Sequence, residues 1–419
     1  KLPNRLTLDP LPEKIVDGRF SGENDLPPEQ RCRILDPETG RVWGFVVVDN
    51  TRRGPGLGGI RLAEDLTLEE VSRLARVMTL KNSGANLPFG GGKAGLVGNP
   101  SVLNENPGLK SDLISLFAEA IFPLDSYIPA PDMGTDEQDL QTIQNVFTQQ
   151  AGSSQKFRGV SGRPTEQGGI PIDEWGLTAH GLFAAAETLE RLDDKFTLKG
   201  SRVVVQGYGN VGSWTAVKLR QAGAILVGAS DIHAGLWNPQ GLDVEELNAV
   251  RHTSQGLRNY KGRIQTKFEG KQVDWLLEAP CDILVPAARP DAVTSKNADR
   301  IQCRVILQGA NTPSSKMTEY YLKNRRGILS LNDFIVNVGG VIGCGVELKM
   351  GAEPDYREKV LKKGIRLYLE ELIYGTVSRN VEEIFRRLKD NPNQDKLFRE
   401  EALKLSEERL GAAQQELWL

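Results

Sequence analysis

The sequence is poor in the residues from which metal and redox centres are built. Its 419 residues include only three histidines and four cysteines. The cysteines form no short pair of the kind that binds zinc or exchanges disulfides, and no histidine has a partner at metal-ligand spacing. We therefore expect no metal site, and we expect buried, reduced thiols at Cys32, Cys281, Cys303 and Cys344.

An excess of charge of either sign and a long apolar run are also missing. The chain has 52 basic and 55 acidic residues, a net charge of −3 and no basic block. This balance argues against nucleic acid or an anionic membrane as the main partner. No apolar run reaches spanning length, and the first residues lack the apolar segment of a signal peptide. We expect a cytoplasmic protein of two or three domains.

What the sequence does contain is a lysine that follows three glycines, in Pro88-Phe89-Gly90-Gly91-Gly92-Lys93. Glycines allow the backbone to approach a ligand closely. Partial burial and a neighbouring cation such as Lys81 would favour the neutral amine of Lys93, the form that can deprotonate a water. An isolated acid at Asp132 could supply the companion acid or base.

Lys81 lies at the end of a predicted helix, residues 67–84. Thr67 and Glu70 form a capping-box pattern at its start. Lys81 continues the apolar stripe of this helix, so its amine either faces a cavity and meets a substrate carboxylate, or reaches water beside the negative helix end. Both alternatives stay open. The stripe consists of Val71, Leu74 and Met78.

A second domain is predicted from a strand, a glycine turn and a helix. Residues 201–206 form an apolar strand, Gly207-Tyr208-Gly209-Asn210-Val211-Gly212 follows, and another strand is expected at 224–229. This βαβ context, with Asp231 near the end of the second strand, favours a dinucleotide site over a turn that serves only helix packing. Further apolar runs, which extend a parallel, doubly wound sheet, lie at residues 282–286, 304–308 and 327–331.

The resulting fold class is α/β with two domains. Residues 1–170 form the first α/β domain, with residues 1–30 wrapping its surface and 152–171 as a linker. Residues 171–349 form the Rossmann-type domain, and the charged helical segments of 350–419 return to the first domain or build an oligomer contact. The elements expected in the first domain are a strand at 42–48, turns at 53–61, the lysine loop, a helix at 111–121 and the Asp132 loop.

Several short segments, in their order along residues 40–350, resemble signatures of the glutamate, leucine, phenylalanine and valine dehydrogenase superfamily. Together they are highly specific. Besides the glycine fingerprint, they are Arg53-Gly54-Pro55, Gly58-Gly59-x-Arg61, Met78-Thr79-x-Lys81-Asn82, Pro88 to Lys93, Pro131-Asp132-x-x-Thr135, Asp282 to Ala288, Gly309-Ala310-Asn311 and Asn337-x-Gly339-Gly340-Val341.

The resemblance implies reversible oxidative deamination of an L-amino acid to a 2-oxo acid and ammonia, with NAD or NADP as cofactor. It implies that Lys81 binds the substrate carboxylate, that Lys93 is the catalytic lysine and that Asp132 is the catalytic acid or base. Gly58, Gly59 and Asn337 are expected near the substrate. The implied cofactor-binding residues are Thr178, Gly207, Gly209, Asn210, Val211, Gly212, Ala287, Ala288 and Asn311. A homo-oligomer, hexameric or octameric, is also implied.

Two departures from the glutamate-specific members bear on the substrate. Those members have a lysine directly before the Gly-Gly-x-Arg segment and a hydroxyl residue after Gly-Gly-Val, where this chain has Leu57 and Cys344. The sequence therefore predicts an uncharged, apolar substrate side chain. A glutamate dehydrogenase with a rearranged pocket is the alternative, and a catalytically silent regulatory homologue is an alternative of another class.

Cofactor preference stays undecided. Ser230 occupies the place that is acidic in the leucine-type members, and Asp231 follows it. A carboxylate on the ribose favours NAD, whereas a serine with His233 nearby could accept the 2′-phosphate of NADP.

Overall fold

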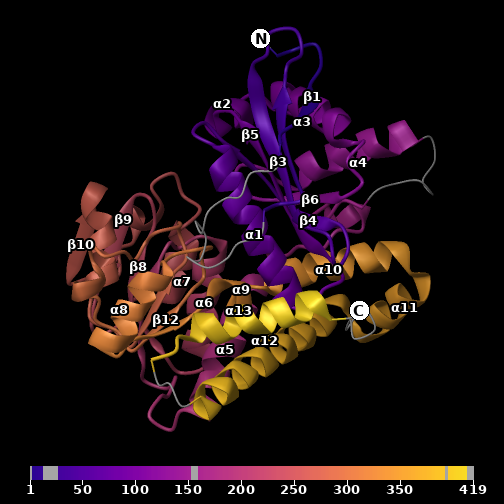
Figure 1. Cartoon of the computed structure of the whole chain (residues 1–419). Helices are drawn as coiled ribbons and strands as arrows, with labels where there is room; N and C mark the ends of the chain where they lie inside the picture. The colour runs from indigo at the N-terminus through magenta and orange to yellow at the C-terminus, as the bar shows by residue number, and fades with distance from the viewer. Residues whose placement is uncertain (1, 13–26, 152–158, 392–394, 413–419) are drawn as a thin grey trace. The chain divides into compact units, whose positions relative to one another are not determined.

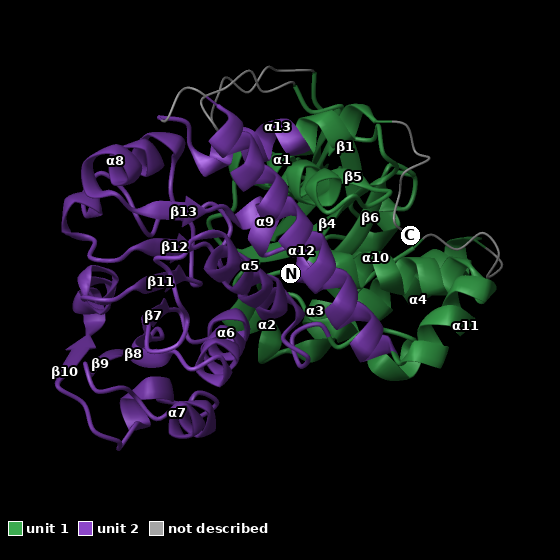
Figure 2. Cartoon of the chain, turned by 90° about the horizontal axis from the view of Figure 1, so that it is seen from below, with its two compact units in different colours: residues 1–171, 341–364, 406–419 green, residues 172–340, 365–405 purple. Residues whose placement is uncertain are grey.

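A computed structural model of the chain describes residues 2–12, 27–151, 159–391 and 395–412 (Figure 1). It forms two compact units, each described by itself below. Unit 1 comprises residues 1–171, 341–364 and 406–419, and unit 2 comprises residues 172–340 and 365–405 (Figure 2). Each unit contains its own sheet with helices, so the α/β fold class predicted from the sequence is confirmed.

The sheet of unit 1 has the strand order β1-β2-β3-β5-β4-β6. Strand β4 runs parallel to β5 and β6, and the other neighbours are antiparallel. Helix α1 packs on one face through Val71 and Ala75, while α3 and α4 pack on the other through Phe117 and Leu140. The elements are β1 (Thr7–Pro10), β2 (Gln30–Leu35), β3 (Val42–Asn50), β4 (Gly56–Ala63), α1 (Leu68–Gly84), β5 (Gly90–Val97), α2 (Pro100–Asn104), α3 (Pro107–Ile121), β6 (Tyr127–Pro131), α4 (Glu137–Ala151) and the short turn η2 (Thr165–Gln167).

Two predictions for unit 1 are wrong in the same way. The turn-rich segment 53–61 contains most of strand β4, and Lys93 lies on strand β5 rather than on a loop. Both segments were predicted as turns or loops because they are rich in glycine. In the structure these glycines lie in strands, where they let neighbouring backbones pack closely. A Cβ on Gly58 would lie 1.7 Å from the carbonyl oxygen of Gly92. The predicted helix 67–84 is confirmed as α1, and the predicted helix 111–121 begins four residues earlier, at Pro107.

The sheet of unit 2 has the strand order β10-β9-β8-β7-β11-β12-β13. Five of these strands are parallel, as predicted, and the antiparallel edge formed by β9 and β10 was not predicted. The elements are α5 (Leu177–Leu192), β7 (Arg202–Gln206), α6 (Asn210–Gln221), β8 (Ile225–Ser230), β9 (Ala234–Trp237), α7 (Val244–Val250), η3 (Gly256–Asn259), β10 (Thr266–Glu269), η4 (Gly270–Glu278), β11 (Ile283–Pro286), η5 (Ala298–Arg300), β12 (Val305–Leu307), α8 (Lys316–Arg326), β13 (Leu329–Leu331) and α9 (Asp333–Val336).

Among the described residues, the C-terminal part of the chain contains the helices α10 (Gly339–Ala352), α11 (Pro354–Lys363), α12 (Ile365–Asp390) and α13 (Phe398–Gly411). The sequence assigned all of 350–419 to the first domain, whereas residues 365–405 cluster with unit 2. The polar contacts between α12 and α5 explain this: Thr188 Oγ1 donates to Ser378 Oγ at 2.9 Å, and His180 Nε2 lies 3.0 Å from the Glu370 carbonyl oxygen. Within the described residues, no helix is long and apolar enough to cross a membrane.

Candidate functional site

An ion pair in unit 1, between a buried lysine and a partly exposed aspartate, joins the two residues predicted to be catalytic. Lys93 lies on β5 and is 3% exposed, and Asp132 directly follows the last residue of β6. The Lys93 Nζ is 2.9 Å from Asp132 Oδ2. The turn that carries Asp132 is held by Thr135, whose Oγ1 accepts from the Asp132 amide at 3.0 Å and donates to the Ile60 carbonyl at 2.8 Å. A base and an acid therefore lie within direct proton-transfer distance.

Arg61 is a third member of this cluster, and no role was predicted for it. Its Nε donates to Asp132 Oδ2 at 3.0 Å, and its Nη1 donates to Glu70 Oε1 at 2.6 Å. Glu70 therefore pairs with Arg61, although Thr67 caps α1 as predicted by accepting from the Glu70 amide. The signal that could have revealed Arg61 is strand register, because the preceding residue, Ile60, pairs with Pro131 next to Asp132.

Together, burial and the charges of this cluster lower the pKa values of both residues predicted to be catalytic. Burial lowers the pKa of the Lys93 amine, Asp132 opposes this shift, and Arg61 lowers it further. Burial alone would raise the pKa of Asp132, but the charges of Lys93 and Arg61 lower it to about 2. Arg61 is thus a cation near Lys93 that the sequence did not suggest. Asp132 is held as a carboxylate, and Lys93 gives up its proton more readily than a free lysine does.

The glycines of β4 have a packing role. A Cβ on Gly59 would lie 2.7 Å from the Asp132 Cβ, so a larger residue there would push Asp132 away from Lys93. At Gly58 it would collide with the backbone of β5. The same two positions keep the neighbouring backbones close. Both were also predicted to contribute to substrate binding. That role stays a prediction.

Lys81, Leu57 and Cys344, three other residues predicted to line the substrate site, are buried in unit 1. Lys81 is 6% exposed in the last turn of α1, and its role in binding the substrate carboxylate stays a prediction. The next residue, Asn82, donates to the carbonyl oxygens of Leu57 and Gly90, so α1 is tied to both β4 and β5. Leu57 is 1% exposed and Cys344 is 7% exposed. That these two side chains contact the substrate stays a prediction.

The glycine turn of unit 2 has the geometry that a dinucleotide needs. Gly207 has a φ of 92°, and a Cβ there would lie 2.7 Å from Ala288. A Cβ on Gly212 would lie 2.0 Å from the Gly207 carbonyl oxygen, whereas a Cβ on Gly209 would meet no described atom within 4 Å. Among the described residues, no side chain caps the first amides of α6. A tight turn, open space above Gly209 and uncapped amides fit the pyrophosphate of NAD or NADP.

Ser230 and Asp231, which were expected to set cofactor preference, accept hydrogen bonds from nearby backbone amides. The Ser230 carbonyl accepts from the amides of Gly207 and Tyr208, and the serine is 1% exposed. Asp231 Oδ1 accepts from the amides of His233 and Ala234, and Oδ2 accepts from that of Leu257. Both carboxylate oxygens of Asp231 thus hold backbone amides. Its role as a ribose ligand stays a prediction.

The structure brings together the two asparagines predicted beside the nicotinamide and substrate. Asn337 Nδ2 lies 3.3 Å from Asn311 Oδ1 and 3.1 Å from the Gly309 carbonyl oxygen. Asn337 is buried, and its Oδ1 finds no hydrogen-bond partner among the described residues. Thr178 lies in the first turn of α5, where its Oγ1 would be 3.1 Å from a Cβ on Gly340. Over the same described ranges, no cluster of His, Cys, Asp and Glu could hold a metal ion.

Comparisons with known proteins agree with the motifs. The family model described as Glutamate/Leucine/Phenylalanine/Valine dehydrogenase matches residues 168–414, and the Glu/Leu/Phe/Val dehydrogenase dimerisation domain matches residues 29–149. A glutamate dehydrogenase of Aeropyrum pernix is 37% identical over 306 residues, which cover 71% of this chain and 69% of the relative. An NADP-specific glutamate dehydrogenase of Saccharolobus shibatae is 36% identical over 349 residues, covering 81% and 77%. The solved hetero-hexameric glutamate dehydrogenase of Thermus thermophilus, in its Leu-bound form, is 28% identical with a TM-score of 0.72, covering 97% of this chain and 88% of that one.

Proposed function

The chain belongs to the Glu/Leu/Phe/Val dehydrogenase family, and on this premise we propose that it is an enzyme that reversibly deaminates an L-amino acid to a 2-oxo acid and ammonia with NAD or NADP. The observation that carries the proposal is the contact of 2.9 Å between Lys93 and Asp132. A protein that only bound ligands would have no chemical need for a desolvated lysine whose pKa is lowered beside a carboxylate.

Each residue of the site then has a role. The nicotinamide, when bound, accepts the hydride of the substrate α-carbon. Lys81 binds the α-carboxylate, the neutral amine of Lys93 takes a proton from the water that attacks the α-carbon, and Asp132 exchanges a proton with the amino nitrogen. The amides at the start of α6 hold the pyrophosphate, and Asn311 and Asn337 offer amide groups to the nicotinamide side.

Glutamate is the substrate with most support. The Aeropyrum, Saccharolobus and Thermus relatives are all glutamate dehydrogenases, so the prediction of an apolar side chain is the less supported one. Leu57, buried where the resemblance expects a lysine, favours an uncharged amino acid as the second candidate. If glutamate is the substrate, a cation from another position has to pair with its distal carboxylate, since an unpaired buried carboxylate costs several kcal/mol.

One assay separates these candidates. NAD and NADP reduction is measured with each of the twenty L-amino acids for the wild type, Leu57→Lys and the matched control Leu57→Met. The highest catalytic efficiency with glutamate in the wild type supports the first candidate, and preference for an uncharged amino acid supports the second. In the second case Leu57→Lys, unlike Leu57→Met, should raise activity on glutamate. No reaction with any amino acid would contradict the proposed function.

We also propose that the protein is a homo-oligomer, because a family dimerisation domain matches residues 29–149. Light scattering that shows a monomer at the assay concentration would contradict this. The Thermus neighbour is a hetero-hexamer, so the chain should be assayed alone after purification. If the pure chain bound the nucleotide but deaminated nothing, the catalytically silent alternative would take precedence.

A further inference from the structure

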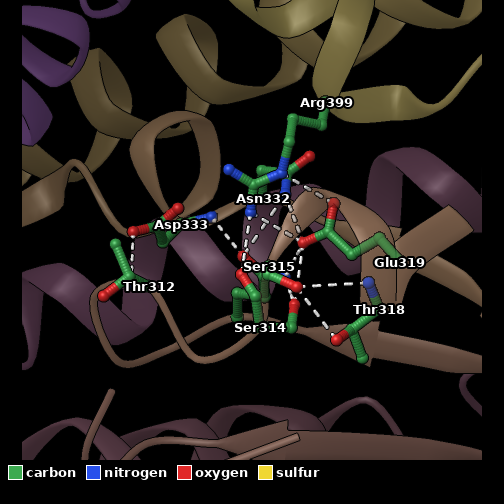
Figure 3. A network of polar contacts seen from close by, with 9 residues as sticks. Thr312, Ser314, Ser315, Thr318, Glu319, Asn332, Asp333 and Arg399 are labelled. Atoms are coloured by element: carbon green, nitrogen blue, oxygen red, sulfur yellow. Dashed lines mark hydrogen bonds and ion pairs between the residues drawn. The ribbon is translucent and has the colours of Figure 1, made fainter. Parts of the chain in front are cut away.

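Unit 2 buries an ion pair that the proposed reaction does not use. Arg399 lies near the start of α13 and Glu319 in the first turn of α8, and they are 1% and 2% exposed. The Arg399 Nε donates to Glu319 Oε2 and its Nη2 donates to Oε1, each at 2.8 Å. Figure 3 shows this bidentate contact within a cluster of polar side chains. Such a pair holds its partners in one orientation, because both hydrogen bonds depend on the same plane.

The Glu319 carboxylate is saturated by further donors. Its Oε1 also accepts from Gln308 Nε2 at 2.7 Å, from Ser314 Oγ at 2.8 Å and from Asn332 Nδ2 at 3.0 Å. Burial raises the pKa of Glu319, but the Arg399 charge and these hydrogen bonds bring it below its ordinary value. The carboxylate is therefore ionised, and it is buried among side chains of the fold itself.

The donors to Glu319 lie where two neighbouring strands end. Gln308 directly follows β12 and Asn332 directly follows β13, and the Gln308 Oε1 accepts from the Asp333 amide at 3.1 Å. The ends of parallel strands are the edge at which α/β sheets bind nucleotides. The loop after β12 carries Asn311, and Asn337 ends the short helix after β13. Through Gln308 and Asn332, the ion pair thus contacts the segments after β12 and β13, which carry Asn311 and Asn337.

A strained residue next to Asn311 is held by Asp333, the residue that follows Asn332. Thr312 has a φ of 47°, a conformation that a β-branched residue rarely adopts. Its amide donates to Asp333 Oδ2 at 2.8 Å, and its carbonyl accepts from the amide of Asp291, which itself has a φ of 53°. Figure 3 shows Thr312 directly beside Asp333. Strain of this kind persists only where surrounding contacts enforce it, and it is concentrated at functional sites.

We propose that Arg399, Glu319 and Asp333 are positioning residues that set the nicotinamide side of the cofactor site through the loops after β12 and β13. Arg399 orients Glu319, Glu319 holds Gln308 and Asn332, and Asp333 keeps Thr312 in its left-handed conformation beside Asn311. The proposal rests on the proposed function, because it assigns the two asparagines to the nicotinamide. It adds that residues distant from the reacting atoms determine cofactor affinity and turnover.

The test compares three variants of the full-length protein. Arg399→Met removes the ion pair, Asp333→Ala removes the acceptor for Thr312, and Lys110→Met is the matched control, which breaks the buried Lys110–Asp139 pair of unit 1. For each, the Kd of NADH and of NADPH is titrated by fluorescence, kcat and the amino acid KM are measured at saturating cofactor, and amide hydrogen exchange is followed by mass spectrometry. Asp333→Ala leaves the ion pair intact, so it tests the proposal even if Arg399→Met does not fold.

Both test variants should raise the cofactor Kd by about tenfold or more and lower kcat by up to about 10²-fold, the cost of a small misplacement of reacting groups. The amino acid KM should change less than about twofold, and exchange should accelerate in residues 309–315 and 332–337. Lys110→Met should lower only the melting temperature. Asp333→Asn, which keeps an oxygen for the Thr312 amide, should retain most of the affinity. Thr312→Gly should partly rescue Asp333→Ala, since glycine needs no brace at this φ.

Unchanged exchange in residues 309–315, together with Kd and kcat within about twofold of the wild type, would overturn the proposal and leave the ion pair a stabilising feature only. The proposal is also overturned if Lys110→Met raises the cofactor Kd as much as Arg399→Met does. Failure of the proposed function has a different signature. In that case the wild type binds NADH or NADPH but deaminates no amino acid, and the Kd and exchange comparisons still decide whether the network positions the loops.

Discussion

Each unit buries a carboxylate between cations and polar groups, but the two carboxylates differ in how completely they are enclosed. Glu319 of unit 2 is 2% exposed, and contacts to both of its oxygens come from within the fold. Asp132 of unit 1 is 19% exposed, and both Lys93 and Arg61 contact its Oδ2. An enclosed carboxylate can only hold its neighbours, whereas one that remains partly accessible can exchange a proton with a bound molecule. Enclosure thus distinguishes the proposed brace in unit 2 from the proposed reaction centre in unit 1.

The largest effect on activity is expected from substitutions in the partly accessible cluster of Lys93, Asp132 and Arg61. Lys93→Ala and Asp132→Asn should each lower kcat by about 10²–10⁴-fold, because each removes a proton-transfer group. The nucleotide Kd, measured by fluorescence titration, should stay unchanged, since the glycine turn at Gly207 lies in the other unit. Turnover close to that of the wild type in either variant would remove that residue from the proposed mechanism.

Breaking the enclosed pair should cost stability. Arg399→Met leaves Glu319 buried without its cation, so the free energy of unfolding should fall by about 3–5 kcal/mol in urea denaturation. The double variant Arg399→Met/Glu319→Met should regain part of this loss, because no buried charge then remains unpaired, although Gln308 and Asn332 lose their acceptor. A double variant less stable than Arg399→Met would contradict the view that charge burial dominates the loss.

The pH dependence of kcat/KM tests how the charges around Lys93 set the pKa of its amine. Lys93 acts as a base only when neutral, so activity should rise as pH increases through its pKa, and the lowered pKa of Lys93 places this rise at lower pH than for an ordinary lysine. The Arg61 charge lowers that pKa and the Glu70 charge raises it. Arg61→Met should therefore move the rising limb to higher pH, and Glu70→Gln should move it to lower pH. Shifts in the same direction would contradict this electrostatic assignment.

The smallest effect is expected for an ion pair that water surrounds. Arg191 and Glu382 are each 47% exposed and lie 2.9 Å apart. Arg191→Ala should change the free energy of unfolding by less than about 1 kcal/mol, because exposed pairs are screened. Steady-state kinetics should be unchanged. A loss as large as that of Arg399→Met would show that exposure does not separate strong from weak pairs in this protein.

The sequence predicted the parts of the fold that are specified locally. The strand β7, the turn at Gly207 and the helix α6 each have their own signals within a few residues, and all three were found. Strands β4 and β5 were misread because the packing of Gly58 against Gly92 is visible only once the strands are paired. The sequence could name Lys93 and Asp132 from residue type and motif.

The partners of these residues depend on register and on distant contacts. Arg61 reaches Asp132 because Ile60 pairs with Pro131, which no pattern within β4 or β6 reveals. Arg399 was missed for a similar reason, since it meets Glu319 across 80 residues of chain. From sequence alone, a charged residue in a helical segment is predicted to lie on the solvent-exposed surface, because charged side chains are rarely buried.

The distance of 80 residues between Glu319 and Arg399 also imposes an order on biosynthesis. All seven strands of the unit 2 sheet precede Arg399 in the chain, so the ribosome completes the sheet before it makes the cation for Glu319. Until α13 docks, closing the core around Glu319 would bury an unpaired carboxylate, which is costly. The nascent chain should therefore acquire its nucleotide site late, only when Arg399 has been synthesised and has reached α8.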